Sequence, residues 1–276
     1  ILDPVFIFGL DLGVSGAALA TIISQACSAV WVLKFLTGKN AVIPLKFSNI
    51  RIKKEISLDI FKLGTANFIM QGTNCLVQIV CNSTLQSYGG DIYVGIMTVT
   101  NSIREIFMLP ISGLISGAQP VISFNYGAKE YKRVKDGIKF NTIMGASYTM
   151  FAWLLVIAFP KFWFSVFSDD LQMIEIGIGA LKIYFFGFVF MAFQFAGQST
   201  FQALGDAKHA IFFSLLRKAI IVTPLTIVLP MLGFGVNGVF LAEPISNVIG
   251  GLASYITMRM TIYKTLEEGG RKKGAF

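Results

Sequence analysis

Residues 14–36 read VSGAALATIISQACSAVWVLKFL and carry no charged side chain before Lys34. A helix that crosses a bilayer needs about 20 predominantly apolar residues, so this run is long enough to span one. The stretch that follows, up to residue 62, is rich in lysine and arginine. A long apolar run that ends in a basic stretch is typical of a transmembrane helix whose last turn reaches the cytoplasm.

Six further apolar runs of similar length follow this one, and a shorter run opens the chain. We predict spans at 58–84, 93–123, 138–160, 171–201, 209–231 and 237–261, and a helix stub at 1–8. The composition agrees, because 54% of the 276 residues are hydrophobic and only 14% are charged. A soluble domain carries about 25% charged residues. The sequence therefore predicts an all-α, polytopic membrane protein.

The gaps between these runs alternate in charge. One set of gaps holds 20 of the 23 basic residues, and its members are 34–62, 129–139, 208–218 and the tail from Arg259. Arg217 and Lys218 are counted in this set as loop residues. The gaps on the opposite side of the membrane hold only one basic residue, Lys161. Because basic loops stay on the cytoplasmic side, we predict a cytoplasmic C-terminus. The net charge of +8 belongs to these short loops and does not indicate a nucleic-acid partner.

An internal repeat joins the two ends of the chain. Residues 13–24, GVSGAALATIIS, match residues 235–246, GVNGVFLAEPIS, at seven of twelve positions. Chance similarity between two apolar helices is the alternative. Two halves in the same orientation, related by an axis along the membrane normal, occur in some transporters. The offset of 222 residues predicts that about four helices of a first half precede residue 1. We therefore expect four parts: the end of a first half at 1–37, a cytoplasmic linker at 38–57, six helices of a second half at 58–262 and a cytoplasmic tail at 263–276.

Three predicted spans carry polar side chains along one helical face. The polar residues are Asn67, Gln71, Asn74, Gln78 and Asn82 in 58–84, Asn101, Glu105, Ser112, Ser116, Gln119 and Ser123 in 93–123, and Gln194, Gln198 and Gln202 at the end of 171–201. Spacings of three and four residues place each set on one face. Because polar groups in lipid are costly, we predict a polar-lined cavity. Hydrogen bonds between helices are the alternative.

Three charged residues lie deep inside the predicted spans. At a rise of 1.5 Å per residue, Arg104, Glu105 and Lys182 are about 16–18 Å from the outer ends of their helices, near the bilayer midplane. An isolated charge there is costly, so we expect Glu105 to pair with Lys182 or Arg104. A pair that only fixes helix packing is the alternative to a gate. The predicted substrate-cavity or gating residues are Asn74, Gln78, Asn101, Arg104, Glu105 and Lys182.

Asp3 is the candidate cation- or proton-binding residue. It lies about 9 Å from the outer end of the stub helix. Pro4 follows it and disfavours helical geometry at Asp3, which would leave carbonyl groups free. A carboxylate beside free carbonyls is a hypothetical site for Na⁺ or H⁺, as in the broken helices of transporters. A solvated carboxylate at a helix end is the alternative.

No pattern in the sequence indicates an enzyme. The three cysteines, Cys27, Cys75 and Cys81, lie in apolar runs and have neither metal-ligand spacing nor the spacing of a disulfide framework. No P-loop, GxSxG, HExxH or CxxC motif occurs. We expect no catalytic residues, no metal and no cofactor beyond a coupling ion.

Two stretches of the chain resemble the multidrug and toxic compound extrusion (MATE) family. Residues 110–128, PISGLISGAQPVISFNYGA, resemble the signature that follows the second helix of each half in that family. Residues 201–205, FQALG, followed by Lys208 and the LLR run at 215–217, resemble the loop before its penultimate helix. The opening Leu2-Asp3-Pro4 is similar to a fifth-helix motif whose acidic residue takes part in cation binding. The resemblance extends from the end of helix five through helix twelve.

The resemblance implies a two-lobed, twelve-helix antiporter that exports cationic and amphipathic compounds in exchange for Na⁺ or H⁺. It implies a monomer in the plasma membrane and a first-lobe ion site at Asp3. Some members place an acidic residue in helix seven, but residues 58–84 have only Asn and Gln in their membrane part, which favours the first-lobe site. A flippase of lipid-linked saccharides is the alternative. A flippase predicts a more cationic cavity. Only two basic residues lie inside the predicted spans, which argues against it.

Overall fold

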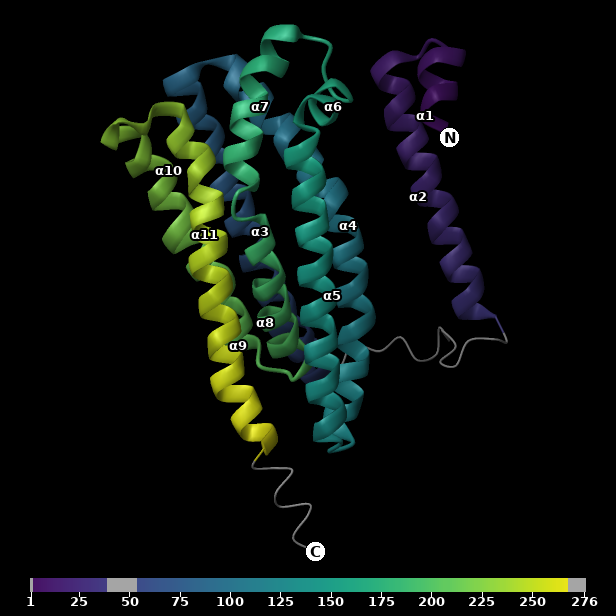
Figure 1. The fold of residues 1–276 in the computed structure, drawn as a ribbon. Coiled ribbons are helices and arrows are strands. Elements are labelled where there is room, and N and C mark those ends of the chain that lie inside the picture. The colour runs from purple at the N-terminus through teal and green to yellow at the C-terminus, as the bar shows by residue number, and fades with distance from the viewer. Residues whose placement is uncertain (1, 39–53, 268–276) are drawn as a thin grey trace, which may run out of the picture. The chain divides into compact units, whose positions relative to one another are not determined.

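The computed structural model describes residues 2–38 and 54–267, and it divides the chain into two compact units, Ile1–Lys62 and Leu63–Phe276 (Figure 1). The described residues form helices and no strand, which confirms the predicted all-α class. The linker predicted at 38–57 and the tail predicted at 263–276 fall largely outside the described residues. The division of the chain into parts of two halves stays a prediction.

Unit 1 contains a bent helical hairpin. It comprises α1 (Leu2–Pro4), the π-helix η1 (Val5–Gly9) and α2 (Gly13–Thr37). The span predicted at 14–36 is confirmed by α2. Gly13 takes a positive φ of +52°, and a Cβ added at Gly16 would lie 2.7 Å from the carbonyl oxygen of Phe6. Glycine is therefore needed at Gly13, where the chain turns into α2, and at Gly16, where α2 touches η1.

Pro4 does not loosen the start of the chain as predicted. Its φ of −59° and ψ of −36° are helical, and Asp3 lies inside α1. The helical geometry at Asp3 contradicts the expected loosening of the turn, and the free carbonyl groups around Asp3 stay a prediction.

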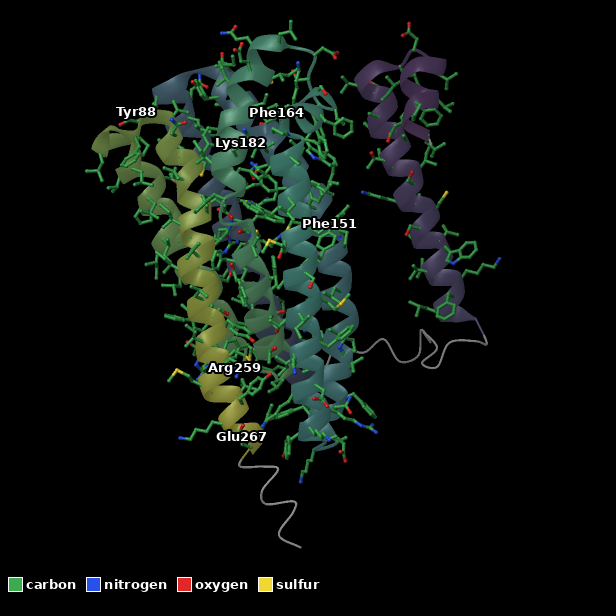
Figure 2. The ribbon with its side chains drawn as sticks, viewed as in Figure 1. Tyr88, Phe151, Phe164, Lys182, Arg259 and Glu267 are labelled. Atoms are coloured by element: carbon green, nitrogen blue, oxygen red, sulfur yellow. The ribbon has the colours of Figure 1, made fainter. Side chains whose placement is uncertain are left out.

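The remaining helices belong to unit 2. They are α3 (Lys54–Gly89), which begins before the unit boundary, α4 (Asp91–Gly127), α5 (Tyr131–Ala158), α6 (Pro160–Ser165), α7 (Leu171–Phe185), η3 (Phe188–Phe190), α8 (Met191–Ala203), α9 (Ala207–Leu215), η4 (Leu216–Val222), α10 (Thr223–Leu229), η5 (Pro230–Phe234), α11 (Gly235–Met258) and η6 (Arg259–Tyr263). In Figure 1, α11 runs along the length of the unit. Arg259 and Glu267 lie at one end, and Tyr88 lies toward the other (Figure 2).

Five helical segments in the described part of the chain are long and apolar enough to cross a membrane. They are Gly13–Thr37, Asp91–Gly127, Tyr131–Ala158, Leu171–Ala203 and Ala207–Glu267. The last segment covers two predicted spans, because the chain turns between them at Gly233 (φ +97°) and Gly235 (φ +53°) with no separate loop. The helix α3 is also long enough, but it is not among the five, since its amide side chains lower its mean hydropathy.

The span predicted at 171–201 is confirmed by the apolar segment Leu171–Ala203, but this segment is not one continuous helix. Helix α7 ends at Phe185, and α8 begins at Met191 after a short turn and η3. A Cβ added at Gly187, in this break, would lie 2.5 Å from the carbonyl oxygen of Pro244 in α11. The break therefore lets the α7–α8 backbone approach α11 closely. Gly251 of α11 packs as tightly against the carbonyl oxygen of Phe190 in η3, so glycines set the contact between this break and α11.

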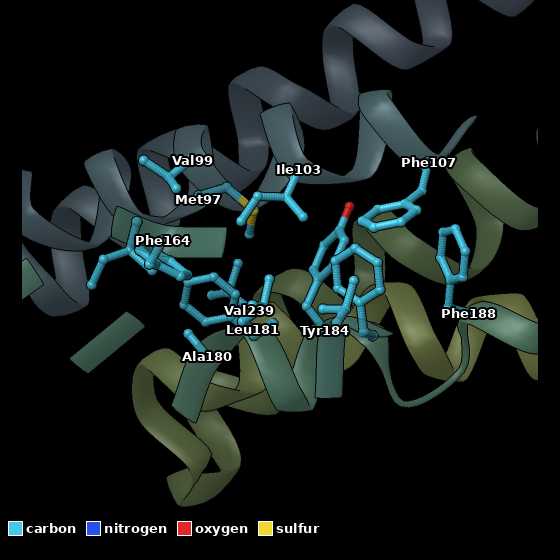
Figure 3. Close-up of a cluster of buried hydrophobic side chains, with 14 of the residues drawn as sticks. Met97, Val99, Ile103, Phe107, Phe164, Ala180, Leu181, Tyr184, Phe188 and Val239 are labelled. Atoms are coloured by element: carbon cyan, nitrogen blue, oxygen red, sulfur yellow. The ribbon is translucent and has the colours of Figure 1, made fainter. Parts of the chain in front are cut away.

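A cluster of buried apolar side chains joins α4, α7 and the start of α11. Ile103 and Phe107 of α4 face Leu181 and Tyr184 of α7 in this core (Figure 3). All four are buried. Tyr184 brings a hydroxyl into the cluster, and this oxygen points toward α4 in Figure 3. This hydroxyl donates a hydrogen bond to Asn101 of α4, which fixes α7 against α4.

Candidate functional site

The candidate site of unit 2 is a buried network of ionised side chains centred on Glu243. Glu243 lies eight residues after the start of α11, or about 12 Å along the helix. Arg104 lies 13 residues into α4, about 20 Å along it. A hydrocarbon core of about 30 Å places both near the middle of the membrane. Charges at this depth are rare in proteins and commonly mark functional sites.

Three cationic side chains surround the Glu243 carboxylate. Arg217 Nη1 donates to Glu243 Oε1 at 2.8 Å and to Asn247 Oδ1 at 2.9 Å. Lys218 Nζ donates to Oε1 and Oε2 of Glu243 at 3.1 and 3.3 Å. Arg104 Nη1 lies 3.7 Å from the same Oε1 atom. The Glu243 side chain is only 8% exposed, so this carboxylate is compensated by direct contacts rather than by solvent.

A π-helical turn places Arg217 and Lys218 side by side against α11. Both residues belong to η4, and Pro224 follows two residues after its end. Proline cannot donate a helical hydrogen bond, so regular geometry is interrupted before it. Two hydroxyls satisfy carbonyl groups here, since Thr223 Oγ1 donates to the Lys218 carbonyl at 3.0 Å and Ser246 Oγ donates to the Arg217 carbonyl at 3.1 Å. Such π-helical turns are frequent at functional sites.

Arg104 links this network to the surface of α4. Its Nη2 atom donates to Glu105 Oε1 at 2.8 Å, so the expected pairing of Glu105 is with Arg104. The Arg104 side chain is 20% exposed and that of Glu105 is 66% exposed. Lys182 has no hydrogen bond or ion pair with any other described residue. It precedes Tyr184 by two residues and so points to the opposite side of α7.

The other predicted cavity residues lie outside the ion network. Asn101 Oδ1 accepts a hydrogen bond from the Tyr184 hydroxyl at 3.2 Å, which joins α4 to α7. Asn74 and Gln78 lie on an exposed face of α3, where Asn74 Nδ2 donates to Gln71 Oε1 at 3.1 Å. The structure therefore brings Arg104 and Glu105 together and leaves Asn74, Gln78 and Lys182 apart from them. The side chain of Asn67 lies outside the described ones.

Two of the three predicted polar faces meet near the ends of α4 and α8. An open cavity of about 350 Å³ is lined by Ser116, Gln119, Pro120, Ser123, Gln202 and Ala203. Its hydroxyl and amide groups come from the stripes predicted on 93–123 and 171–201. The stripe on α3 contributes no lining residue to this cavity.

Asp3 lies in unit 1, on the exposed side of α1. It has no hydrogen bond or ion pair with another residue of the described part of the chain. Its role as a cation or proton site stays a prediction.

Two members of the network lie elsewhere than the sequence predicted. Arg217 and Lys218 were counted with a cytoplasmic loop, but both are largely buried in η4, inside the apolar segment Ala207–Glu267. The number of basic residues that lie away from the ends of the apolar segments therefore rises from two to four. Glu243 was quoted in the repeat without a role. The sequence did contain a signal for its role, because Glu243 is the only acidic residue between 235 and 261 and lies inside a predicted span.

The fold and this network define a polytopic α-helical membrane protein that buries ionised side chains between its spanning helices. The MatE family model matches residues 67–228, more than half of the sequence. The chain belongs to the MatE family, as its resemblance had indicated.

Two curated relatives cover nearly all of the chain. It is 28% identical over 271 residues to the multidrug export protein MepA of Staphylococcus saprophyticus, which covers 96% of this chain and 59% of the relative. It is 27% identical over 256 residues to MepA of Staphylococcus aureus, covering 93% of this chain and 56% of the relative. The chain thus spans less than two thirds of the length of these relatives.

Solved structures share the fold. A crystal structure of MATE in complex with MaL6 aligns with a TM-score of 0.87 at 20% identity, over 97% of this chain and 60% of that one. A MOP superfamily transporter from Pyrococcus furiosus aligns with a TM-score of 0.86 at 21% identity, over 96% and 60% of the two chains. The predicted MATE-like helical bundle is therefore confirmed.

Proposed function

We propose that the protein is a secondary-active exporter of cationic and amphipathic compounds that works by alternating access. The observation that carries this proposal is the match of residues 67–228 to the MatE family model. The relatives named multidrug export protein support the same substrate class. Export is driven by the entry of Na⁺ or H⁺, and no other cofactor takes part. The protein acts as a monomer in the plasma membrane with its C-terminus in the cytoplasm.

Asp3 is the residue that binds the coupling ion in this proposal. It is a carboxylate on a helix that lies next to the first spanning helix, and α1 exposes it. Binding of Na⁺ or H⁺ neutralises the carboxylate, and this change of charge biases the side to which the cavity opens. The Glu243 network has a different role, since three cations in contact with one buried carboxylate favour a fixed packing of α4, η4 and α11.

The test is ethidium transport by the complete protein in inverted membrane vesicles, with Na⁺ and pH gradients imposed one at a time. One of the two gradients should drive ethidium uptake, and Asp3→Asn should abolish the dependence on it. Asp11→Asn is the matched control, because Asp11 is an exposed carboxylate with a φ of +52° that asparagine also tolerates. Gradient-driven uptake that persists in Asp3→Asn would rule out Asp3 as the coupling residue.

A flippase of lipid-linked saccharides is the second candidate, and one observation favours it. Four basic side chains lie away from the ends of the apolar segments of unit 2, at Arg104, Lys182, Arg217 and Lys218, where two were expected. The Pyrococcus furiosus transporter is itself described by a binding pocket of reversed polarity that suggests a different function. Reconstituted vesicles distinguish the two candidates, since a flippase moves a fluorescent lipid-linked saccharide between leaflets and does not accumulate ethidium.

A further inference from the structure

We propose that Arg104 binds a carboxylate or phosphate group of the transported solute. This inference rests on the proposed export function and adds an anionic group to the solutes that the protein accepts. It assigns the binding contact to the edge of the Arg104 guanidinium that Glu105 occupies in the structure.

The network carries more positive than negative charge. Arg104, Arg217 and Lys218 contribute three positive charges, and Glu105 and Glu243 contribute two negative ones. Uncompensated charge near the bilayer midplane is costly, so this cluster is completed by one further anion. Because Glu243 already contacts all three cations from the inside, the additional anion has to come from the exposed side.

Arg104 is the only cation of this network with a substantial opening to that side. Its side chain is 20% exposed, compared with 9% for Arg217 and 12% for Lys218. One face of its guanidinium is held by Glu243, since Nη1 lies 3.7 Å from Oε1. The other edge is formed by Nε, which is buried, and by Nη2, which pairs with the exposed carboxylate of Glu105. Arg104 is therefore held by Glu243 inside the network and covered on its other edge by the exposed Glu105.

The outer edge of Arg104 is only half used. Glu105 Oε1 accepts from Nη2, and Nε is buried without a hydrogen-bond partner among the described residues. An arginine edge that holds a carboxylate or phosphate in the preferred way uses both N–H groups in two parallel bonds. Glu105 is the chain neighbour of Arg104, and adjacent residues of a helix do not face each other, so its carboxylate meets this edge at one atom.

Exchange of Glu105 for a ligand anion is energetically accessible. The Glu105 side chain is 66% exposed, and exposed ion pairs contribute little. A ligand carboxylate that bonds Nη2 and Nε together would satisfy the unused donor and release Glu105 to its own exposed position. The depth of Arg104, about 20 Å along α4, favours a solute over a lipid headgroup as the source of the anion.

The test uses two probes that share a pyrene ring and a four-carbon linker, one ending in a carboxylate and the other in a quaternary ammonium. Binding to the complete protein is measured by fluorescence anisotropy in neutral phosphatidylcholine nanodiscs. Arg104→Gln should weaken carboxylate binding by at least about tenfold and leave the ammonium probe within about twofold. Glu105→Gln should strengthen carboxylate binding several-fold, because the competing carboxylate is gone.

Matched controls separate these effects from a general change of charge. Lys161→Gln and Glu175→Gln remove one charge of each sign at exposed positions outside the network and should leave both probes unchanged. Addition of phosphatidylglycerol should not displace the carboxylate probe, and displacement would assign the site to a lipid headgroup instead. Unchanged carboxylate affinity in both Arg104→Gln and Glu105→Gln would overturn the proposal. The proposed export function is tested separately by ethidium transport in the wild-type protein, so it can hold even when the proposal for Arg104 fails.

Discussion

Replacing Glu243 by glutamine should strongly destabilise unit 2. The substitution keeps the size of the side chain but removes the charge that Arg217 and Lys218 contact at 2.8 and 3.1 Å. Glu243 is 8% exposed, so solvent cannot replace the lost carboxylate. Removal of one partner from a buried ion pair costs about 3–5 kcal/mol, much of it from leaving the other charge unpaired. Because two buried cations lose their partner here, we expect a value within that range.

The assay is unfolding of the purified complete protein in mixed micelles with increasing sodium dodecyl sulfate, followed by far-UV circular dichroism. Glu105→Gln is the matched control, because this exposed carboxylate pairs with the same network and should cost at most about 1 kcal/mol. Adding Lys218→Met to Glu243→Gln should recover part of the loss, since one unpaired cation is removed. A Glu243→Gln protein as stable as the control would refute the reasoning.

Two further substitutions test the packing around the site. Gly187→Ala should destabilise the same unit by about 1–3 kcal/mol, because the added Cβ would lie 2.5 Å from the backbone oxygen of Pro244. Gly113→Ala is the control, since its Cβ would meet no atom within 4 Å, and it should be neutral in the same unfolding assay. Tyr184→Phe removes the 3.2 Å hydrogen bond to Asn101 and should lower the free energy of unfolding by about 0.6 kcal/mol in the sodium dodecyl sulfate titration. A loss of stability above about 2 kcal/mol would contradict the assignment of a single interhelical hydrogen bond.

The repeat found in the sequence corresponds to the same local structure in both units. Gly13 and Gly235 take φ values of +52° and +53°, and each begins a long helix. Gly16 and Gly238, three residues further on, leave 2.7–2.8 Å between an added Cβ and the backbone of the preceding helix. These positions were predictable as a pair because glycine is required where φ is positive or where two backbones touch.

Long-range contacts account for what the sequence did not predict. The break at Gly187 depends on Pro244, which lies far along the chain, and no local residue pattern near 187 ends a helix. The burial of Arg217 likewise depends on Glu243 of another helix. Arg217 and Lys208 lie close in sequence, so a charge count along the chain could not separate the loop residue from the buried one.

The order of the charges along the chain bears on how the protein enters the membrane. Arg217 and Lys218 leave the ribosome before their partner Glu243, which lies in the next helix. Inserted alone, a helix with two central cations would meet a translocon penalty of about 5–7 kcal/mol. The carboxylate on α11 removes most of that penalty only when both helices are present. The two helices joined at Gly233–Gly235 are therefore expected to partition into the bilayer together, as one hairpin, during synthesis.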